Sequence, residues 1–134
     1  MMNKMLLAAV ALSSAALLSS ASAFAAGECS GADLKGHYTY WMQGTDKDGK
    51  PYAEVGQEHY DGAGKVTNKF AVAGSEKMSD DTATYVVNGD CSGVVTYASG
   101  TVYNIFVAPG GGSFVFSSAK DNIQAGENTR VKEE

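Results

Sequence analysis

The residues best suited to chemistry are gathered in one short segment of the sequence. Glu54, Glu58, His59 and Asp61 lie close together, and their side chains are of the types that hold metal ions. The segment alternates as a β-strand does, however, so Glu58 and His59 point to opposite faces. A metal site would need His37 to join from a neighbouring strand. The pattern therefore favours a solvated strand face, and we expect no metal or other cofactor.

Two carboxylates on one face of a strand could also act as an acid–base pair. Alternation places Glu54 and Glu58 on one face with Tyr52 and Tyr60. Residues four apart on a strand are separated by roughly 14 Å, so the spacing alone does not define a catalytic pair. No serine lies in a Gly-x-Ser-x-Gly elbow, and the glycine-rich "APGGGS" has no helix after it to hold a phosphate. The sequence predicts no catalytic residue.

The elements that must position these side chains are strands. Short runs of β-branched and aromatic residues alternate with polar ones, and turn-forming Gly, Asp, Asn and Pro separate them. No window of helical length shows a 3.6-residue period. We expect loops at 75–81 and 120–126. We expect eight strands, at 35–44, 52–60, 65–74, 82–88, 93–98, 101–108, 113–119 and 127–133.

Eight short strands joined by tight turns form an up-and-down meander. Closing such a sheet removes its exposed edges. Eight strands give a barrel just wide enough to be filled by side chains or to hold one small ligand. We therefore predict an all-β fold, a single antiparallel up-and-down β-barrel of about eight strands, with a two-sheet β-sandwich as the alternative.

The N-terminal segment has the layout of a secretory signal peptide. Lys4 precedes an apolar run over 5–18, and Ala-x-Ala patterns follow it. The run is short for a membrane span, so no stable membrane insertion is expected after cleavage. We predict a signal peptide over 1–25, a β-barrel domain over 26–134, and export to the periplasm or the extracellular space.

Cysteine usage and charge agree with export. In an oxidising compartment, the pair Cys29 and Cys91 is predicted to form a disulfide bond. Because Lys4 belongs to the leader, nine basic residues face fifteen acidic ones in the rest of the chain, a net charge of −6. Nucleic acids and anionic membranes are bound by basic surfaces, so neither is an expected partner. The oligomeric state is left open.

Two motifs carry a family resemblance. Gly36-His37-Tyr38 resembles the Gly-x-Trp signature that opens lipocalin-type barrels, with Tyr in place of Trp. "YDGAGKV" followed by "ATYVVNGDCSG" is similar to small secreted bacterial proteins with calycin-like barrels, related in shape to allene oxide cyclases. The resemblance implies a calycin-like barrel in which Arg130 packs over the Tyr38 ring and closes one end. No catalytic residue of allene oxide cyclases can be placed on this sequence.

The aromatic residues suggest a function. Buried tyrosine hydroxyls need partners, so inward tyrosines beside Glu54, Glu58 or Asn68 would form an apolar pocket with a few polar contacts. We predict a binding protein for a small, partly apolar molecule, although a packed core would use the same face. Alternation places on this face Tyr38, Tyr40, Tyr60, Phe70, Tyr85, Tyr97, Phe106, Phe114 and Phe116. The candidate ligand-binding residues are Tyr38, Tyr40, Glu58, Tyr60, Phe70 and Tyr85.

Two other functions are compatible with the sequence. An interaction or structural protein of the cell envelope would use its outer surface, with Trp41 in an exposed apolar patch. A cyclase- or isomerase-like enzyme would need a titratable cluster at the barrel mouth. The candidates for that cluster are Glu54, Glu58, His37 and His59.

Overall fold

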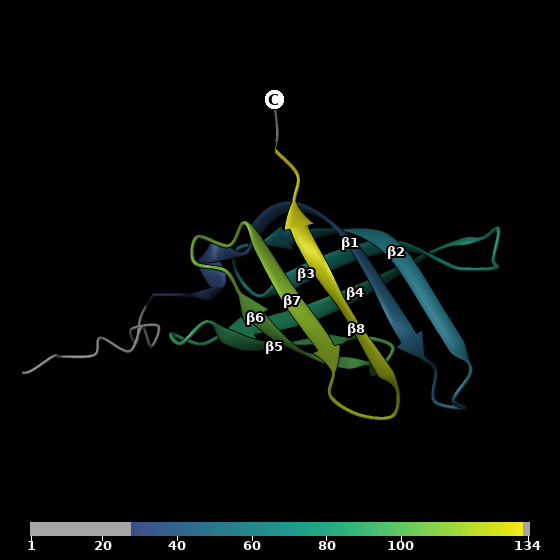
Figure 1. The fold of residues 1–134 in the computed structure, drawn as a ribbon. Coiled ribbons are helices and arrows are strands. Elements are labelled where there is room, and N and C mark those ends of the chain that lie inside the picture. The colour runs from purple at the N-terminus through teal and green to yellow at the C-terminus, as the bar shows by residue number, and fades with distance from the viewer. Residues whose placement is uncertain (1–27, 133–134) are drawn as a thin grey trace, which may run out of the picture.

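The chain folds into a closed barrel of eight antiparallel strands, each paired with the next and the last with the first (Figure 1). The computed structural model describes residues 28–132, so the predicted signal peptide lies outside the described residues. The predicted fold class is confirmed, because the pairing of the first and last strands excludes an open sandwich. A short 3-10 helix, η1 (Gly31–Asp33), precedes the strands β1 (Lys35–Thr45), β2 (Pro51–Asp61), β3 (Lys65–Val72), β4 (Met78–Val87), β5 (Ser92–Tyr97), β6 (Val102–Val107), β7 (Ser113–Ser118) and β8 (Ile123–Arg130).

Two strands begin four residues earlier in the chain than the sequence predicts. β4 starts at Met78 and β8 at Ile123, both inside predicted loops. In each case a neighbouring strand supplies the pairing: Met78 lies opposite Ala71, and Ile123 lies opposite Thr45. The polar residues of these segments did not indicate strands, because the charged Asp80 lies at an exposed position of β4 and the polar Gln124 lies on the inner face of β8.

Alternation assigns the two faces of most strands correctly. Tyr38, Tyr40 and Met42 of β1 point into the barrel, whereas Trp41 points outward and is 49% exposed. Phe106 is an exception, since we expected it on the inner face and it is 63% exposed. The inward positions of β6 are taken by its other apolar residues, Tyr103, Ile105 and Val107.

One end of the barrel is closed. Leu34 is fully buried there, and the Tyr85 hydroxyl donates to the carbonyl oxygens of Gly31 and Leu34, each at 2.8 Å. The Arg130 guanidinium carbon lies 5.4 Å from the centre of the Tyr38 ring, and its Nη2 donates to the Tyr38 hydroxyl at 2.9 Å. The expected contact between Arg130 and Tyr38 is therefore confirmed. In Figure 1 the purple η1 and the light green β6–β7 connection lie together at this end.

A disulfide bond ties the N-terminal segment to the same end. Cys29 and Cys91 are bonded as predicted, with their Cα atoms 5.0 Å apart. Cys91 adopts the left-handed conformation in the tight turn between β4 and β5, with φ 69°. The disulfide indicates an oxidising compartment. Within residues 28–132, no helix has the length and apolar character that a membrane span requires.

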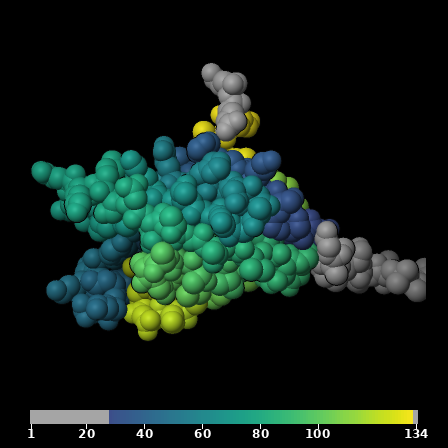
Figure 2. Space-filling view, turned by 180° about the vertical axis from the view of Figure 1, so that it is seen from behind, coloured from purple at the N-terminus to yellow at the C-terminus, as the bar shows by residue number. Residues whose placement is uncertain are grey.

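The opposite end carries the β1–β2, β3–β4, β5–β6 and β7–β8 connections. This follows from the strand order, since the strands of an up-and-down barrel alternate in direction. Figure 2 shows the tips of the β1–β2 and β3–β4 connections projecting from the body of the molecule. Access to the barrel interior is from this end.

Candidate ligand-binding site

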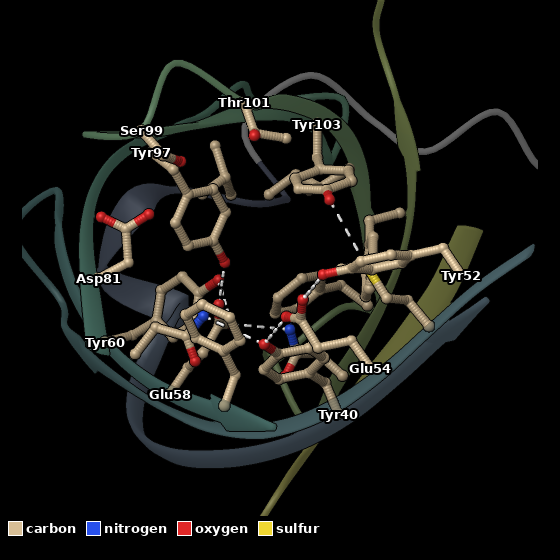
Figure 3. A pocket seen from close by; sticks show the side chains of 18 residues that line it. Tyr40, Tyr52, Glu54, Glu58, Tyr60, Asp81, Tyr97, Ser99, Thr101 and Tyr103 are labelled. Atoms are coloured by element: carbon tan, nitrogen blue, oxygen red, sulfur yellow. Dashed lines mark hydrogen bonds between the residues drawn. The ribbon is translucent and has the colours of Figure 1, made fainter. Parts of the chain in front are cut away.

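A cavity of about 140 Å³ lies inside the barrel, and all eight strands contribute to its wall (Figure 3). Ser99 is exposed and Asp81 and Thr101 are half-buried, so this part of the lining marks the mouth. Deeper in the barrel the wall is aromatic, with two glutamates on β2. An engineered cavity of about 150 Å³ binds benzene, so this cavity suits a molecule of six or seven non-hydrogen atoms, roughly.

Glu54 lies in the wall nearer the mouth and is held by two phenols. The Tyr40 hydroxyl donates to Oε1 and the Tyr52 hydroxyl donates to Oε2. Burial raises the pKa of Glu54, the two phenol hydrogen bonds oppose that rise, and the negative charge of Asp81 adds to it. Glu54 is therefore a carboxyl group whose ionisation depends on its surroundings.

Glu58 lies one step deeper and is 1% exposed. Its Oε1 accepts a hydrogen bond from the Tyr97 hydroxyl. Its Oε2 accepts from the Tyr60 hydroxyl at 2.9 Å and from Asn128 Nδ2 at 2.8 Å. Burial raises the pKa of Glu58, and the three hydrogen bonds oppose that rise. Both glutamates therefore have their local donors in place but, in the described part of the chain, no opposite charge beside them.

The tyrosine hydroxyls around the glutamates stay protonated and therefore act as hydrogen-bond donors. Burial is the largest cause that raises the pKa of Tyr40, Tyr60 and Tyr97, and the neighbouring carboxyl groups raise it further. These phenols stay protonated at every physiological pH, because the pKa of a free tyrosine is already about 10. The wall therefore presents hydroxyl protons to the carboxylates and ring surfaces to the cavity.

Two amide side chains of the cavity wall leave an acceptor without a partner among the described residues. Asn68 and Asn128 are 6% and 2% exposed, and both line the cavity. The Nδ2 atom of each donates within the wall, Asn68 to the Tyr40 hydroxyl at 3.1 Å and Asn128 to Glu58. The Oδ1 atom of each accepts no hydrogen bond from any residue in the range 28–132. Buried acceptors of this kind are uncommon, so each needs an occupant of the cavity or a bound water.

The charged side chains that line the cavity in the described part of the chain are all acidic. Glu54, Glu58 and Asp81 contribute three carboxyl groups, and within residues 28–132 no Lys, Arg or His side chain lines the cavity. Arg130 lies at the closed end, where its Nη2 donates to the carbonyl oxygen of Asp33 at 2.5 Å and to the Tyr38 hydroxyl. The interior is therefore acidic without a basic partner in its wall.

The structure brings four of the six candidate ligand-binding residues to the cavity. Tyr40, Glu58, Tyr60 and Phe70 line it. Tyr38 and Tyr85 point into the barrel at the closed end, outside the lining, and their hydroxyls donate to backbone carbonyls. The candidate set omitted several lining residues that share the inward face. They are Glu54, Asn68, Asp81, Tyr97, Tyr103 and Asn128.

Alternation was the signal that could have found these residues. Asn68 lies two positions before Phe70 on β3, and Asn128 lies two positions before Arg130 on β8. The sequence placed Asn68 beside the inward tyrosines but assigned no face to Asn128, because the polar character of an asparagine ordinarily suggests an outward position.

The histidines lie on the outer face. His37 and His59 are cross-strand partners, with ring centres 4.7 Å apart. In the part of the chain that the structure describes, no group of three or more His, Cys, Asp or Glu is placed to hold a metal ion. Of the four residues that a cyclase- or isomerase-like enzyme would need, only Glu54 and Glu58 reach the cavity.

The fold and the cavity define a class of protein, a closed eight-stranded up-and-down barrel with an acidic, tyrosine-rich interior. No protein-family model matches the sequence, and no curated protein is detectably similar to it. The function is therefore argued from the site itself.

Proposed function

We propose that this protein is an exported, non-enzymatic binding protein that holds a small, partly apolar molecule inside its barrel. The observation that carries the proposal is the cavity of about 140 Å³, walled by aromatic rings and bearing a few convergent polar groups. Ligand sites in proteins have this composition. The Cys29–Cys91 disulfide supports export, and the calycin-like resemblance supports an interior site.

The energetics of the cavity favour an occupant. Aromatic rings that border an unfilled space lack contacts on that side. The interior of an eight-stranded barrel can be filled by its own side chains. Here the side chains stop short of filling it, and the aromatic rings of Phe70 and Phe116 face the space. A bound molecule would restore the missing contacts.

Native mass spectrometry tests this function. The mature protein is purified without detergent from its own envelope fraction, and its mass is compared before and after denaturation. We expect a reproducible extra mass that denaturation removes. A bare protein mass, short only of the two hydrogens of the disulfide, would contradict the proposal.

A matched pair of variants locates the ligand. Val95 lines the cavity, whereas its neighbour Val94 faces outward. Val95→Phe fills the cavity and should abolish the extra mass, whereas Val94→Phe adds the same ring outside and should leave it. Near-UV circular dichroism checks that both variants are folded.

A second candidate function is interaction through the outer surface, and one arrangement favours it. Trp41 lies opposite Val55 on one side and Glu127 on the other, and Glu127 lies opposite Val115. Phe106 follows opposite Val115. The four apolar residues of this row are exposed.

Sedimentation velocity tests whether this row mediates self-association. We expect the mature protein to self-associate and Trp41→Ser to reduce the association. A wild type that stays monomeric at high concentration would show that the row is not used for self-assembly.

A further inference from the structure

The charge of the cavity limits what it can hold. Glu54 and Glu58 are buried, Asp81 lies at the mouth, and no basic side chain within residues 28–132 lines the space. An ionised carboxylate away from water is costly unless a positive charge lies beside it. Phenol hydrogen bonds lower that cost but supply no charge. An occupant with a positive charge would supply what the wall lacks, whereas an anionic one would add to the repulsion.

The hydrogen-bonding groups of the wall limit the occupant further. The Tyr40 and Tyr60 hydroxyls donate to the glutamates, so their protons are already used. Among the buried groups of the wall within residues 28–132, the positions left without a partner are acceptors, the Oδ1 atoms of Asn68 and Asn128, each more than nine-tenths buried. An occupant that satisfies them must donate hydrogen bonds. A charged group with N–H protons meets this requirement and the charge requirement together.

The rest of the wall is apolar and aromatic. The rings of Phe70, Phe114 and Phe116 line the cavity together with Tyr40 and Tyr60. Aromatic faces attract cations and also make favourable contact with hydrocarbon. An inorganic cation would use the oxygen atoms alone and leave this wall without contact. The wall therefore suits an occupant with a hydrocarbon body.

We propose that the ligand is a small organic ammonium ion, a protonated amine on a compact hydrocarbon body of about six or seven non-hydrogen atoms. The ammonium N–H groups donate to the Oδ1 atoms of Asn68 and Asn128, the positive charge offsets the carboxylates of Glu54 and Glu58 in the same wall, and the hydrocarbon lies against the phenylalanine rings. Asp81 at the mouth attracts the incoming cation. This inference rests on the proposed binding function and names the chemical class of its ligand.

Isothermal titration of the mature protein with two probes tests the inference. The cyclohexylammonium ion, added as its chloride, and cyclohexanol have the same ring and the same number of non-hydrogen atoms, but only the first is charged. We expect the ammonium ion to bind at least about tenfold more tightly than the alcohol at neutral pH. Equal affinities, or tighter binding of the alcohol, would overturn the ammonium inference and leave the binding function intact. If neither probe binds, the ammonium inference is also overturned. The binding function is tested separately, by the native mass of the purified protein.

Matched variants distinguish the effect of a carboxylate in the cavity on binding from the effect of the net charge of the protein. Glu54→Gln should weaken binding of the ammonium ion about tenfold or more and leave that of cyclohexanol unchanged. Glu127→Gln removes the same charge from the outer face of β8 and should change neither. An equal loss in both variants would show general attraction to an acidic protein and overturn the site. Displacement of the ammonium ion by calcium chloride, at matched ionic strength, would indicate an inorganic cation site and overturn the ligand class.

The pH dependence of binding supplies a test that needs no variant. Glu54 is faced by Tyr40 from β1, Tyr52 from β2 and Asp81 from β4. Glu58 is faced by Tyr60 from β2, Tyr97 from β5 and Asn128 from β8. The tyrosines stay protonated and cyclohexylammonium stays charged below about pH 8, so among the described side chains that line the cavity only the carboxyl groups change their charge. Affinity for the ammonium ion should rise with pH between about pH 4 and pH 8 while that for cyclohexanol stays level, and a level ammonium profile would contradict the inference.

Discussion

The ring of Tyr40 lies directly against Gly56, its cross-strand partner on β2. A Cβ atom at Gly56 would stand 2.5 Å from Tyr40 Cε1 and 2.8 Å from the carbonyl oxygen of Lys69. The glycine therefore makes room for the ring whose hydroxyl donates to Glu54. A residue without a side chain at the centre of a strand is thus part of the site, because it sets where the phenol and the carboxylate meet.

Replacing this glycine should disturb the site and the fold together. Gly56→Ala should push the Tyr40 ring off Glu54 and lower the free energy of unfolding by about 1–3 kcal/mol, a typical cost of overpacking. Urea denaturation measures it. Gly112→Ala is the control, because nothing lies within 4 Å of a Cβ at Gly112. Similar losses in the two variants would show that the contact with Tyr40 does not matter.

The tyrosines should resist ionisation in the folded protein. The pKa of all seven is raised, with burial the largest cause in each case. A raised tyrosine pKa adds stability below about pH 10 that is lost at higher pH. Absorbance at the tyrosinate band should therefore show little ionisation at pH 10 and a cooperative rise with unfolding above it. A gradual titration centred on pH 10, like that in denaturant, would contradict the buried network.

The glutamates should make the domain more stable in mild acid than at neutral pH. The pKa of Glu54 and Glu58 is raised above the ordinary value of 4.5, so their stabilising contribution is complete below that pH and is lost as pH rises through the folded pKa. Asp61 and Asp90 have lowered pKa, so their contribution is lost only below 3.8, outside this window. The melting temperature should fall from pH 4.5 to neutral.

Variants of the glutamates check the origin of this pH dependence. Glu54→Gln and Glu58→Gln remove the titrating groups and should each flatten the profile of melting temperature against pH. Glu127→Gln on the outer face should keep the slope of the wild type. A wild-type profile that rises toward neutral pH would mean that the buried carboxyl groups are not the controlling ones.

The disulfide should contribute strongly to stability. Cys29 and Cys91 are 62 residues apart, and cross-linking a loop of that length stabilises a protein by about 4 kcal/mol in the chain-entropy model. We expect the double variant Cys29→Ala, Cys91→Ala and the reduced wild type to lose similar free energies of unfolding in urea. A loss below about 1 kcal/mol in both would show that the N-terminal segment is held by its other contacts.

The sequence was sufficient to predict the face on which most side chains lie. The two-residue period is local, so it assigned Tyr40, Glu54 and Glu58 to one face without knowledge of the fold. It did not indicate depth along the barrel axis. Tyr38 and Tyr40 share a face, yet the first seals the closed end and the second reaches the cavity. Depth depends on the stagger between paired strands, which distant segments decide together.

The hydrogen-bond partners of the buried polar residues also could not be predicted from the sequence. Asn128 donates to Glu58, 70 residues away, and Tyr97 donates to the same carboxyl group from β5. Nothing in either local segment predicts these contacts. The starts of β4 and β8 were missed for the same reason, because Ala71 and Thr45 extend them by pairing from elsewhere in the chain.

A crystal structure of the mature protein, purified without detergent from its own envelope, tests the central claim most directly. We expect electron density for a compact molecule in the cavity, within hydrogen-bond distance of Asn68 Oδ1 and Asn128 Oδ1 and against the Phe70 and Phe116 rings. A barrel interior closed by its own side chains, or one that holds ordered water alone, would contradict it.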